Sequence, residues 1–459
     1  MPVHLIDSPL LGDRVSTPEM RAIFEAQSQY QSWLDVEAAL AEAQAEIGMI
    51  PAEAARAIRQ AARIEALDLD AVKEHGRVTG HPLLGIVRVL RENAGEAHGT
   101  WAHYGATTQD IIDSGHMLLA QRAHRLIDGK IAAILEDGLP LLETHRDTLA
   151  VARTHGLHAL PFTFGFKVAS WLEELARNRE RWRDAGERSL VGSICGAVGT
   201  YAPWGKHGFE IQDRTCARLG LAAPRMSWQS QRDRVAELSA VMALIAGTAA
   251  RIANEIYQMN KTEVGELAEP YRKGLMGSST MPHKVNPVKC EWLIAIARIV
   301  RHNAGVMFEC MEVEDERDTT MWRTEWVTMP ESFCLLSGAL EHLHQLIAGL
   351  QVRPERMRGN LDMLQGVLMS ERVMFVLQRA MPLGHAHDVV HEASLAALAE
   401  KRPLVDVLLE DAEVAKHFTR EELQEALKPE GYIGLSGEVV DRIAGDIRLG
   451  LDAAAAKPL

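Results

Sequence analysis

The segment between residues 262 and 286 combines residue types that bind an anion with residue types that could move a proton. Its glycine and serine residues include Gly265, Gly274, Gly277, Ser278 and Ser279. Glycine lets backbone N–H groups approach a ligand closely, Lys284 adds a positive charge, and Asn286 adds a neutral donor. Pro287 suits the first turn of a following helix, whose positive end would face the same anion. The segment is therefore predicted to be a functional loop.

These donors suit the removal of a proton from a carbon next to a carboxylate. That step creates a doubly charged aci-carboxylate, which a catalyst must hold with several converging donors. A serine hydroxyl becomes a base at neutral pH only where positive charge and N–H groups favour its alkoxide. The alternative is a solvated linker with a capping lysine, and residue types alone leave both interpretations open.

The elements that position this loop are predicted to be helices, because helical periodicity dominates the sequence. One set of apolar residues recurs at three- and four-residue steps: Leu238, Met242, Ile245, Ala249, Ile252 and Ile256. Polar residues lie between them, which is the pattern of a long helix with a wide buried stripe. Alternating patterns of strand length are scarce, so the sequence predicts an all-α protein.

We expect three helical domains. They are an N-terminal helical domain at 1–99, a central long-helix bundle at 100–350 that contains the loop 274–287, and a C-terminal helical domain at 351–459. The chain has no linker rich in Pro, Gly or Ser, so the three should pack continuously. The helix at 238–256 is apolar on more than one stripe and needs neighbours on several sides, which a bundle shared between subunits would supply.

Composition excludes several classes of partner. The formal net charge is −14, and no run is rich in Lys or Arg, which argues against nucleic acid. The first eight residues lack a basic stretch followed by an apolar one, and no apolar run approaches ~18 residues, so we expect no membrane partner and a cytoplasmic location. The five cysteines form no Cys-x-x-Cys pair, which argues against disulfides and a thiolate zinc site.

The string Gly-Ser-Ser-Thr-Met-Pro-His-Lys-Val-Asn-Pro at 277–287 resembles the signature loop of the fumarase/aspartase superfamily. Members of that superfamily cleave a carbon–nitrogen or carbon–oxygen bond and usually release fumarate. The resemblance implies that Ser279 is the base and that Lys284 and Asn286 bind a substrate carboxylate. We include Met281 among the expected substrate contacts, and we call residues 274–287 the signature loop.

Two further segments are similar to substrate-binding segments of the same superfamily. Residues 103–110 resemble its first carboxylate-binding segment, in which Thr107 and Thr108 contact the substrate. Residues 229–234 also fit the superfamily, and they add Gln231 as an expected substrate contact.

An acid is implied by a fourth segment. Residues 153–158 resemble the segment whose histidine, here His155, gives a proton to the leaving group. Histidine suits that role because its pKa lies near the operating pH. Glu291 matches the superfamily residue that pairs with this histidine, and a carboxylate on one ring nitrogen orients the imidazole.

Two branches of the superfamily compete for this chain, adenylosuccinate lyase and 3-carboxy-cis,cis-muconate cycloisomerase. Segments far from the chemistry, at 16–24, 322–326 and 432–434, look like the cycloisomerase. His155 and Glu291 favour the lyase, because the bacterial cycloisomerases carry tryptophan and alanine at those positions. Expelling a carboxylate needs little help, whereas expelling an amine requires a proton. The pair therefore predicts a poor leaving group, an amine.

The purine substrate of adenylosuccinate lyase does not fit residues 315–326. That branch has a serine-rich segment followed by arginine, whereas this chain has Trp322 and Trp326. Arg323 could bind an extra carboxylate of a smaller substrate, and a surface or interface ion pair is the equal alternative. His81 occupies the position where the lyases place an active-site histidine.

We therefore expect a homotetrameric lyase whose sites are shared between subunits and whose tetramer core is the central bundle. It would perform anti β-elimination on a small polycarboxylate of succinyl type, by carbon–nitrogen cleavage of a non-nucleotide N-succinyl amine, and release fumarate. The alternatives are the cycloisomerase and an inactive structural protein, as in lens crystallins of this superfamily. His387 and His391 share a helix face, but that segment aligns with an ordinary helix of the superfamily. We expect no metal and no cofactor.

Overall fold

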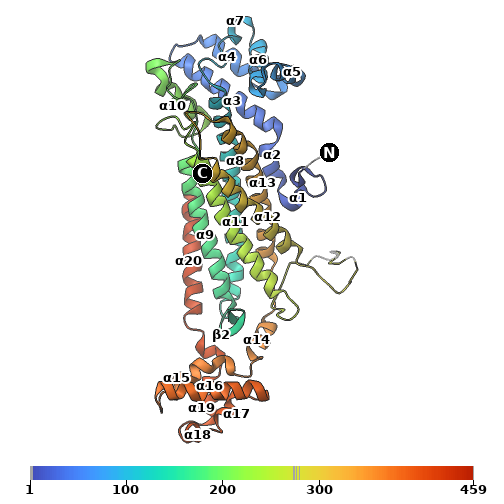
Figure 1. The fold of residues 1–459 in the computed structure, drawn as a ribbon, viewed down its shortest axis with the longest axis vertical. Coiled ribbons are helices and arrows are strands. Elements are labelled where there is room, and N and C mark those ends of the chain that lie inside the picture. The colour runs from blue at the N-terminus through green and yellow to red at the C-terminus, as the bar shows by residue number, and fades with distance from the viewer. Residues whose placement is uncertain (1–3, 272–273, 275–276, 279, 458–459) are drawn as a thin grey trace.

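Helices dominate the fold, as the sequence predicted. The computed structural model describes residues 4–271, 274, 277–278 and 280–457 (Figure 1). The strands in this described part form two small antiparallel pairs, β1 (Leu149–Thr154) with β2 (Leu157–Thr163) and β3 (Leu267–Ala268) with β4 (Gln351–Val352). The all-α prediction is confirmed, and the β1–β2 hairpin is an addition to it.

Short and medium helices form the N-terminal end of the molecule, at the top of Figure 1. They are α3 (Ala26–Glu46), α4 (Ala52–Ala61), α5 (Leu69–Thr79), α6 (Pro82–Asn93) and α7 (Glu96–Gly99). The chain begins with α1 (Gly12–Val15) and α2 (Pro18–Phe24), which lie lower, beside the long helices of the bundle. Single turns of 3-10 helix lie at Leu5–Asp7 and Ile64–Ala66.

Long helices form the middle of the molecule and run side by side along its long axis (Figure 1). They are α8 (Thr108–Thr144), α9 (Phe164–Ser189), α11 (Asp233–Met259), α12 (Val288–Glu309), α13 (Thr319–Gly349) and α20 (Ser436–Ala456). The shorter α10 (Gly208–Leu219) follows a 3-10 turn at Gly205–His207. With 37 residues, α8 is about 55 Å long at the usual helical rise.

The helix α11 is the centre of this bundle. The predicted stripe from Leu238 to Ile256 is buried throughout, which confirms the sequence pattern. By length and composition α11 could cross a membrane, but 67% of its apolar window is buried inside the fold, as expected for a core helix. Packing against α9, α12 and α13 accounts for this burial.

The C-terminal part of the chain contributes to two different cores. Small helices at the bottom of Figure 1 enclose a core of their own. They are α15 (Ser370–Leu377), α16 (Leu383–Glu400), α17 (Leu404–Leu408), α18 (Ala412–His417) and α19 (Arg420–Ala426), with 3-10 turns at Val367–Met369 and Pro429–Tyr432. The helix α14 (Pro354–Asp362) leads into them, and its Met357 belongs to the main core. The chain then returns to the bundle through α20, whose Val440, Ala444 and Ile447 belong to the main core.

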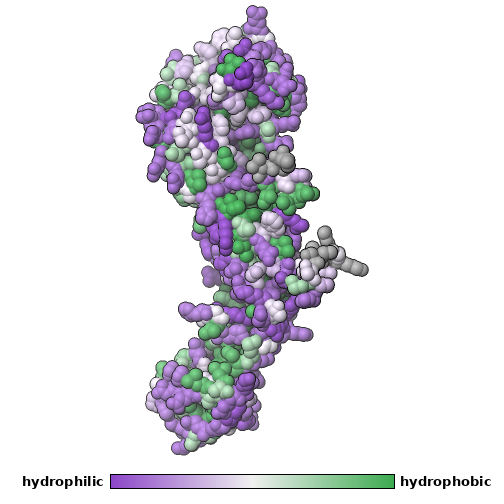
Figure 2. Space-filling view, turned by 45° about the vertical axis from the view of Figure 1, so that its right-hand side comes forward, coloured by the Kyte–Doolittle hydropathy of each residue, from purple (hydrophilic) through white to green (hydrophobic). Residues whose placement is uncertain are grey.

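Apolar side chains remain exposed on the bundle. Figure 2 shows apolar surface gathered in patches along the middle of one face. Exposed apolar residues on α12 and α13 include Ile299, Val306, Phe308 and Val327. Exposed apolar patches on a folded chain commonly mark an interface.

Candidate active site

The start of α8 carries the predicted carboxylate-binding threonines. Thr107 precedes the helix and Thr108 is its first residue, and both are partly exposed. The N–H of Thr107 donates to Oδ2 of Asp110 at 3.0 Å, which fixes the first turn. Nη1 of Arg317 donates to Oγ1 of Thr107 at 2.6 Å. A hydroxyl pair beside a guanidinium can hold a carboxylate.

Asp110 anchors this helix start to a neighbouring segment. Its buried carboxylate also accepts the backbone N–H groups of Cys195 at 3.0 Å and Gly196 at 2.9 Å. Burial raises the pKa of Asp110 to about 6, against the opposing effect of these N–H donors. The backbone of Thr107 is therefore held by a buried polar centre and not only by helix propensity.

His81 and Arg323 lie at the same end of the molecule as the threonines. His81 directly precedes α6, and burial lowers its pKa, followed by the positive charges of Arg323, His103 and Arg317. Arg323 is exposed near the start of α13. The predicted residues His81, Thr107 and Arg323 thus come together with Arg317, which sequence reasoning did not assign to the site.

An ion pair near the threonines was also not predicted from the sequence. Nδ1 of His103 lies 2.6 Å from Oε1 of Glu37, whose side chain is fully buried. Burial alone would lower the pKa of His103, but the charge and hydrogen bond of Glu37 outweigh it, so the pKa is raised. The only sequence signal was the presence of His103 at the head of the threonine segment, because Glu37 lies 66 residues away.

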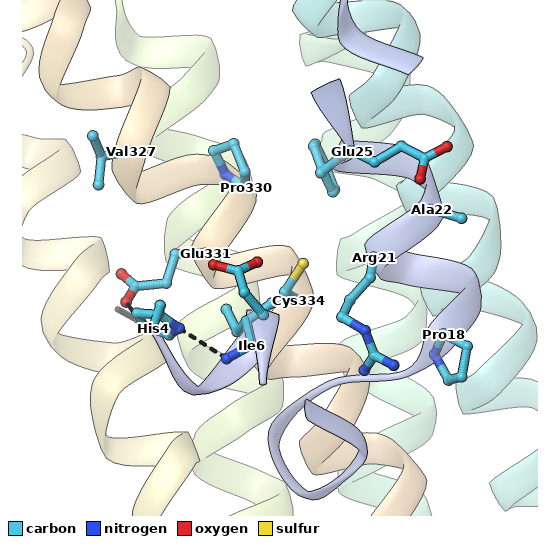
Figure 3. Close-up of a pocket in the computed structure, with 12 residues that line it drawn as sticks. His4, Ile6, Pro18, Arg21, Ala22, Glu25, Val327, Pro330, Glu331 and Cys334 are labelled. Atoms are coloured by element: carbon cyan, nitrogen blue, oxygen red, sulfur yellow. Dashed lines mark hydrogen bonds and ion pairs between the residues drawn. The ribbon is translucent and has the colours of Figure 1, made fainter. Parts of the chain in front are cut away.

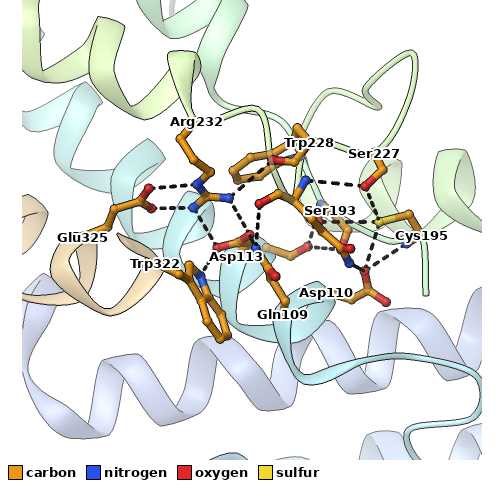
Figure 4. A network of polar contacts seen from close by, with 12 residues as sticks. Gln109, Asp110, Asp113, Ser193, Cys195, Ser227, Trp228, Arg232, Trp322 and Glu325 are labelled. Carbon is orange, nitrogen blue, oxygen red and sulfur yellow. Dashed lines mark hydrogen bonds and ion pairs between the residues drawn. The ribbon is translucent and has the colours of Figure 1, made fainter. Parts of the chain in front are cut away.

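A buried polar network links the segments around this end of the bundle (Figure 4). Arg232 donates to Asp113 of α8 at 2.9 Å and to Glu325 of α13 at 2.8 Å. Their side chains are between 2% and 4% exposed. Nε1 of Trp322 donates to Asp113 at 2.7 Å, so this indole is locked into the network.

Gln231 directly precedes Arg232 and is exposed. Its Nε2 lies 3.5 Å from Sδ of Met226. The buried Arg232 fixes the backbone next to Gln231, and the Gln231 amide lies at the surface.

His155 lies at the other end of α8, in the turn between β1 and β2. Its φ of 51°, followed by 82° at Gly156, makes the tight turn, and its side chain is exposed. Arg153 anchors the hairpin through two hydrogen bonds to the buried Glu266, of 2.7 and 2.9 Å. Figure 1 shows β2 at the lower end of the bundle, whereas the helices that directly precede α8 lie at the upper end, so α8 begins there.

The described part of the signature loop (274, 277–278 and 280–287) lies in a third place, beside the bundle before α12 (Figure 1). Met281 and Lys284 are exposed and Asn286 is partly exposed. Ser279, the predicted base, lies outside the described residues. Gly277 has a packing reason, because a Cβ there would lie 2.5 Å from the carbonyl oxygen of Lys284.

The start of α12 differs from the sequence expectation. Pro287 precedes the helix, which begins at Val288. The first N–H groups of α12 donate to Glu269, from Lys289 at 3.1 Å and from Cys290 at 2.8 Å. A protein carboxylate therefore takes the place at this helix end that we expected a substrate anion to occupy. Glu291, in the first turn, is exposed.

The predicted residues consequently lie in three separate places of one chain. Within the described residues, His155 and Glu291 form no hydrogen bond or ion pair with each other. The threonines and His155 are separated by the length of α8, about 55 Å, which no small substrate can bridge. One chain brings together residues that are predicted to bind carboxylates, but its described residues do not complete a site for elimination.

Other features of the molecule lie apart from these residues. A cavity of about 570 Å³ lies between the N-terminal arm, α2 and α13 (Figure 3). Its lining includes His4, Arg21, Glu331 and Cys334, none of which was predicted to act on a substrate. On α16 the rings of His387 and His391 stack at 6.0 Å, and the described residues hold no group of three metal-ligating side chains.

Two known protein families together match most of the chain. The family described as "Lyase" matches residues 13–301, and the family described as "Adenylosuccinate lyase C-terminus" matches residues 366–443. Together these matches span the start of α8, the hairpin, the signature loop and the small C-terminal helices.

Individual relatives align over nearly the whole chain. It is 40% identical to the N-acetyl-S-(2-succino)cysteine lyase of Dickeya dadantii, over 96% of this chain and 97% of that protein. It is 38% identical to the adenylosuccinate lyase of Pyrococcus horikoshii, with the same two coverages. Among solved structures, the 3-carboxy-cis,cis-muconate lactonizing enzyme from Pseudomonas putida superposes with a TM-score of 0.90 at 33% identity, over 96% of this chain and 100% of that one.

Proposed function

The chain belongs to the fumarase/aspartase superfamily of lyases, and from that premise we propose that it eliminates a substituent from a 2-substituted succinate and releases fumarate. The observation that carries the proposal is the 40% identity, over 96% of the chain, to a lyase that acts on a succinylated cysteine. The substrate is not a nucleotide, because the buried Trp322 and the partly buried Trp326 occupy the segment that would have to grip a phosphate.

The elimination uses one base and one acid. Ser279 removes the proton from the carbon next to a carboxylate, and the electron pair of that C–H bond forms the new double bond. The bond to the leaving atom breaks on the opposite face, and His155, oriented by Glu291, gives that atom a proton. Fumarate and the protonated leaving group are the products.

Donors from two segments hold the succinate. Thr107 and Thr108, with Gln231 beside them in the assembled site, bind one carboxylate. Lys284, Asn286 and Met281 of the signature loop surround the other, where the negative charge of the aci-carboxylate develops. His81 is neutral near pH 7 because its pKa is lowered, so it contributes a hydrogen bond and not a charge.

The complete site is built from several copies of the chain, as a homotetramer. Support comes from the separation of the threonines and His155 by the length of α8 and from the exposed apolar side chains of α12 and α13. Light scattering coupled to size-exclusion chromatography measures the mass directly. A monomer with full activity would contradict the shared site.

An amine is the first candidate for the leaving group, because His155 and Glu291 would supply the proton that an amine needs. A thiol is the second candidate, because of the relatives that act on N-acetyl-S-(2-succino)cysteine. The two candidates share the succinate half of the substrate and differ only in the leaving atom.

The test compares three compounds with the purified protein: an N-succinyl amine, an S-(2-succino) thiol and 3-carboxy-cis,cis-muconate. Chromatography detects fumarate from the first two and the lactone from the third. Fumarate from either succinate supports the proposal, and the better substrate identifies the leaving atom. Turnover of the carboxymuconate alone would replace the lyase by the cycloisomerase, and no turnover of any compound would favour the structural protein.

A further inference from the structure

We infer that Arg323 is a specificity residue that recognises a third carboxylate, carried by the leaving group of the substrate. This inference rests on the proposed function, because it adds a requirement on the half of the substrate that is expelled. The substrate class becomes a succinate whose leaving amine or thiol is itself an acid, such as an amino acid or a mercapto acid.

Two of the three basic side chains named near the threonines already have partners within the chain. Arg317 is engaged with the hydroxyl of Thr107 at 2.6 Å, and His103 is paired with Glu37 at 2.6 Å. Among the described residues, the side chain of Arg323 forms neither an ion pair nor a hydrogen bond. An exposed guanidinium without a carboxylate partner beside a substrate-binding helix start is suited to bind an anionic group of the ligand.

Arg323 lies at the same end of the bundle as the predicted carboxylate site, because Trp322 directly before it donates to Asp113 in the second turn of α8 at 2.7 Å. Its charge reaches His81, whose imidazole also senses His103 and Arg317. Arg317 in turn touches Thr107. The hydrogen bonds of Trp322 to Asp113 and of Arg317 to Thr107 place the start of α13 beside the threonines proposed to hold the succinate, so a ligand bound there would extend toward the Arg323 side chain.

The backbone of Arg323 is held rigidly, which allows a specific contact. Trp322 before it donates to Asp113 at 2.7 Å, and Glu325 after it pairs with Arg232 at 2.8 Å (Figure 4). Trp322 is 4% exposed and Glu325 is 4% exposed. Two buried side chains on one helical turn therefore fix the backbone position of Arg323. Ligand binding has to order only the side chain of Arg323.

The leaving group is the part of the substrate that the third carboxylate must occupy. Both succinate carboxylates already have proposed donors, one on the threonine segment and the other on the signature loop. A third acid on the succinate half would give a substituted fumarate and not fumarate. A carboxylate on the expelled amine or thiol leaves the elimination itself unchanged.

The experiment uses substrate pairs that differ only by this carboxylate. Alanine is compared with ethylamine as the leaving amine, and N-acetylcysteine with N-acetylcysteamine as the leaving thiol, each attached to C2 of succinate. We expect the wild-type protein to prefer the acid member of the pair by about 10- to 100-fold in kcat/KM, the range of a hydrogen-bonded ion pair. Fumarate release is measured for both members.

Variants of Arg323 then test whether its side chain causes the preference for the acid member of the pair. Arg323→Gln should remove the preference by lowering kcat/KM for the acid member alone, and Arg323→Lys should keep part of it, since lysine retains the charge but not the planar fork. Arg442→Gln is the matched control, because Arg442 is exposed on α20 and forms no ion pair among the described residues.

Two results would overturn the inference while the proposed function stands: equal kcat/KM for both members in the wild type, or an equal loss for both members in Arg323→Gln. Failure of the wild-type protein to release fumarate from any of the four compounds would instead overturn the proposed function, and the inference with it.

Discussion

Arg317 donates a hydrogen bond of 2.6 Å to the hydroxyl of Thr107, although 210 residues separate them in the sequence. The guanidinium occupies a lone pair of the hydroxyl oxygen, so the hydroxyl proton remains free to be donated to a carboxylate. The same contact places a positive charge beside that carboxylate. This end of the bundle is therefore suited to bind a carboxylate, as we propose for the substrate, whereas the proposed base and acid must come from elsewhere.

Co-expression of two variants that are each inactive should restore activity. Ser279→Ala removes the proposed base and His155→Asn the proposed acid, and α8 separates His155 from the threonines of its own chain. Mixed oligomers, obtained by co-expression, would contain some sites with both native residues. Fumarate release by the mixture, against each variant expressed alone, measures the recovery. No recovery would mean that base and acid belong to the same chain.

Ser279→Ala alone should lower kcat by at least about 100-fold while the oligomer mass stays unchanged, because it removes the group that takes the proton. Ser278→Ala is the control in the same loop. The Ser278 hydroxyl accepts the N–H of Met281 at 3.0 Å, so its loss should affect the turn more than the chemistry. A kcat near the wild-type value in Ser279→Ala would remove this residue from the mechanism.

His155→Asn should affect substrates according to their leaving group. An amine cannot leave without a proton, so its kcat/KM should fall by about 100- to 10,000-fold, and a more acidic leaving group should lose less. The measurement is the slope of log kcat/KM against the pKa of the leaving group, in wild type and variant. Parallel lines for wild type and His155→Asn would count against an acid role for His155. The variant Glu291→Gln should change the slope in the same direction, but less.

The buried network of Arg232 should matter for stability as well as for the site. Glu325→Gln leaves Arg232 without one of its two carboxylates in a place where the side chains are 2% and 4% exposed. We expect the free energy of unfolding to fall by about 3–5 kcal/mol, measured by urea denaturation. The control is Glu74→Gln, whose partner Arg77 is exposed and whose loss should change stability little. Equal effects in both variants would show that burial of the pair is unimportant.

The pair of His103 and Glu37 should make stability depend on pH. The pKa of His103 is raised in the folded chain, so the folded state binds a proton more tightly than the unfolded state does. This contribution is present in full below the ordinary histidine pKa of 6.5 and is lost as the pH rises through the folded pKa.

The matching variant is Glu37→Gln. The difference in unfolding free energy between wild type and Glu37→Gln should be larger at about pH 6 than at about pH 9. A difference that stays constant over this range would show that the imidazole does not gain its proton from the pairing. Urea denaturation at both pH values, with the oligomer mass checked at each, makes the comparison.

Local patterns in the sequence predicted the helices but not the hairpin. The helix α11 was predictable because its apolar residues repeat at the helical period over many turns. Residues 149–163 lack an alternating pattern and include Pro161, so nothing local indicated strands. Contacts formed elsewhere in the fold hold them, above all the pair of Arg153 with the buried Glu266.

The residues of the candidate site were likewise only partly predictable from the sequence. Residues within continuous motifs, such as Thr107 and His155, could be proposed from the sequence, and their roles stay predictions. Arg317 could not be proposed, because its partner lies 210 residues away. Glu269 likewise replaces the expected anion at the start of α12 from twenty residues before Lys289, a relation that no helix-start pattern contains.

The return of α20 to the main bundle has a consequence for how the chain folds during synthesis. Helices α15 to α19 enclose their own core and are made before α20. Val440, Ala444 and Ile447, which complete the first core, thus reach the ribosome exit only after the second core has emerged. Until then the apolar side of α9 that α20 covers has no native cover, and a nascent chain in that state is open to aggregation or to capture by a chaperone.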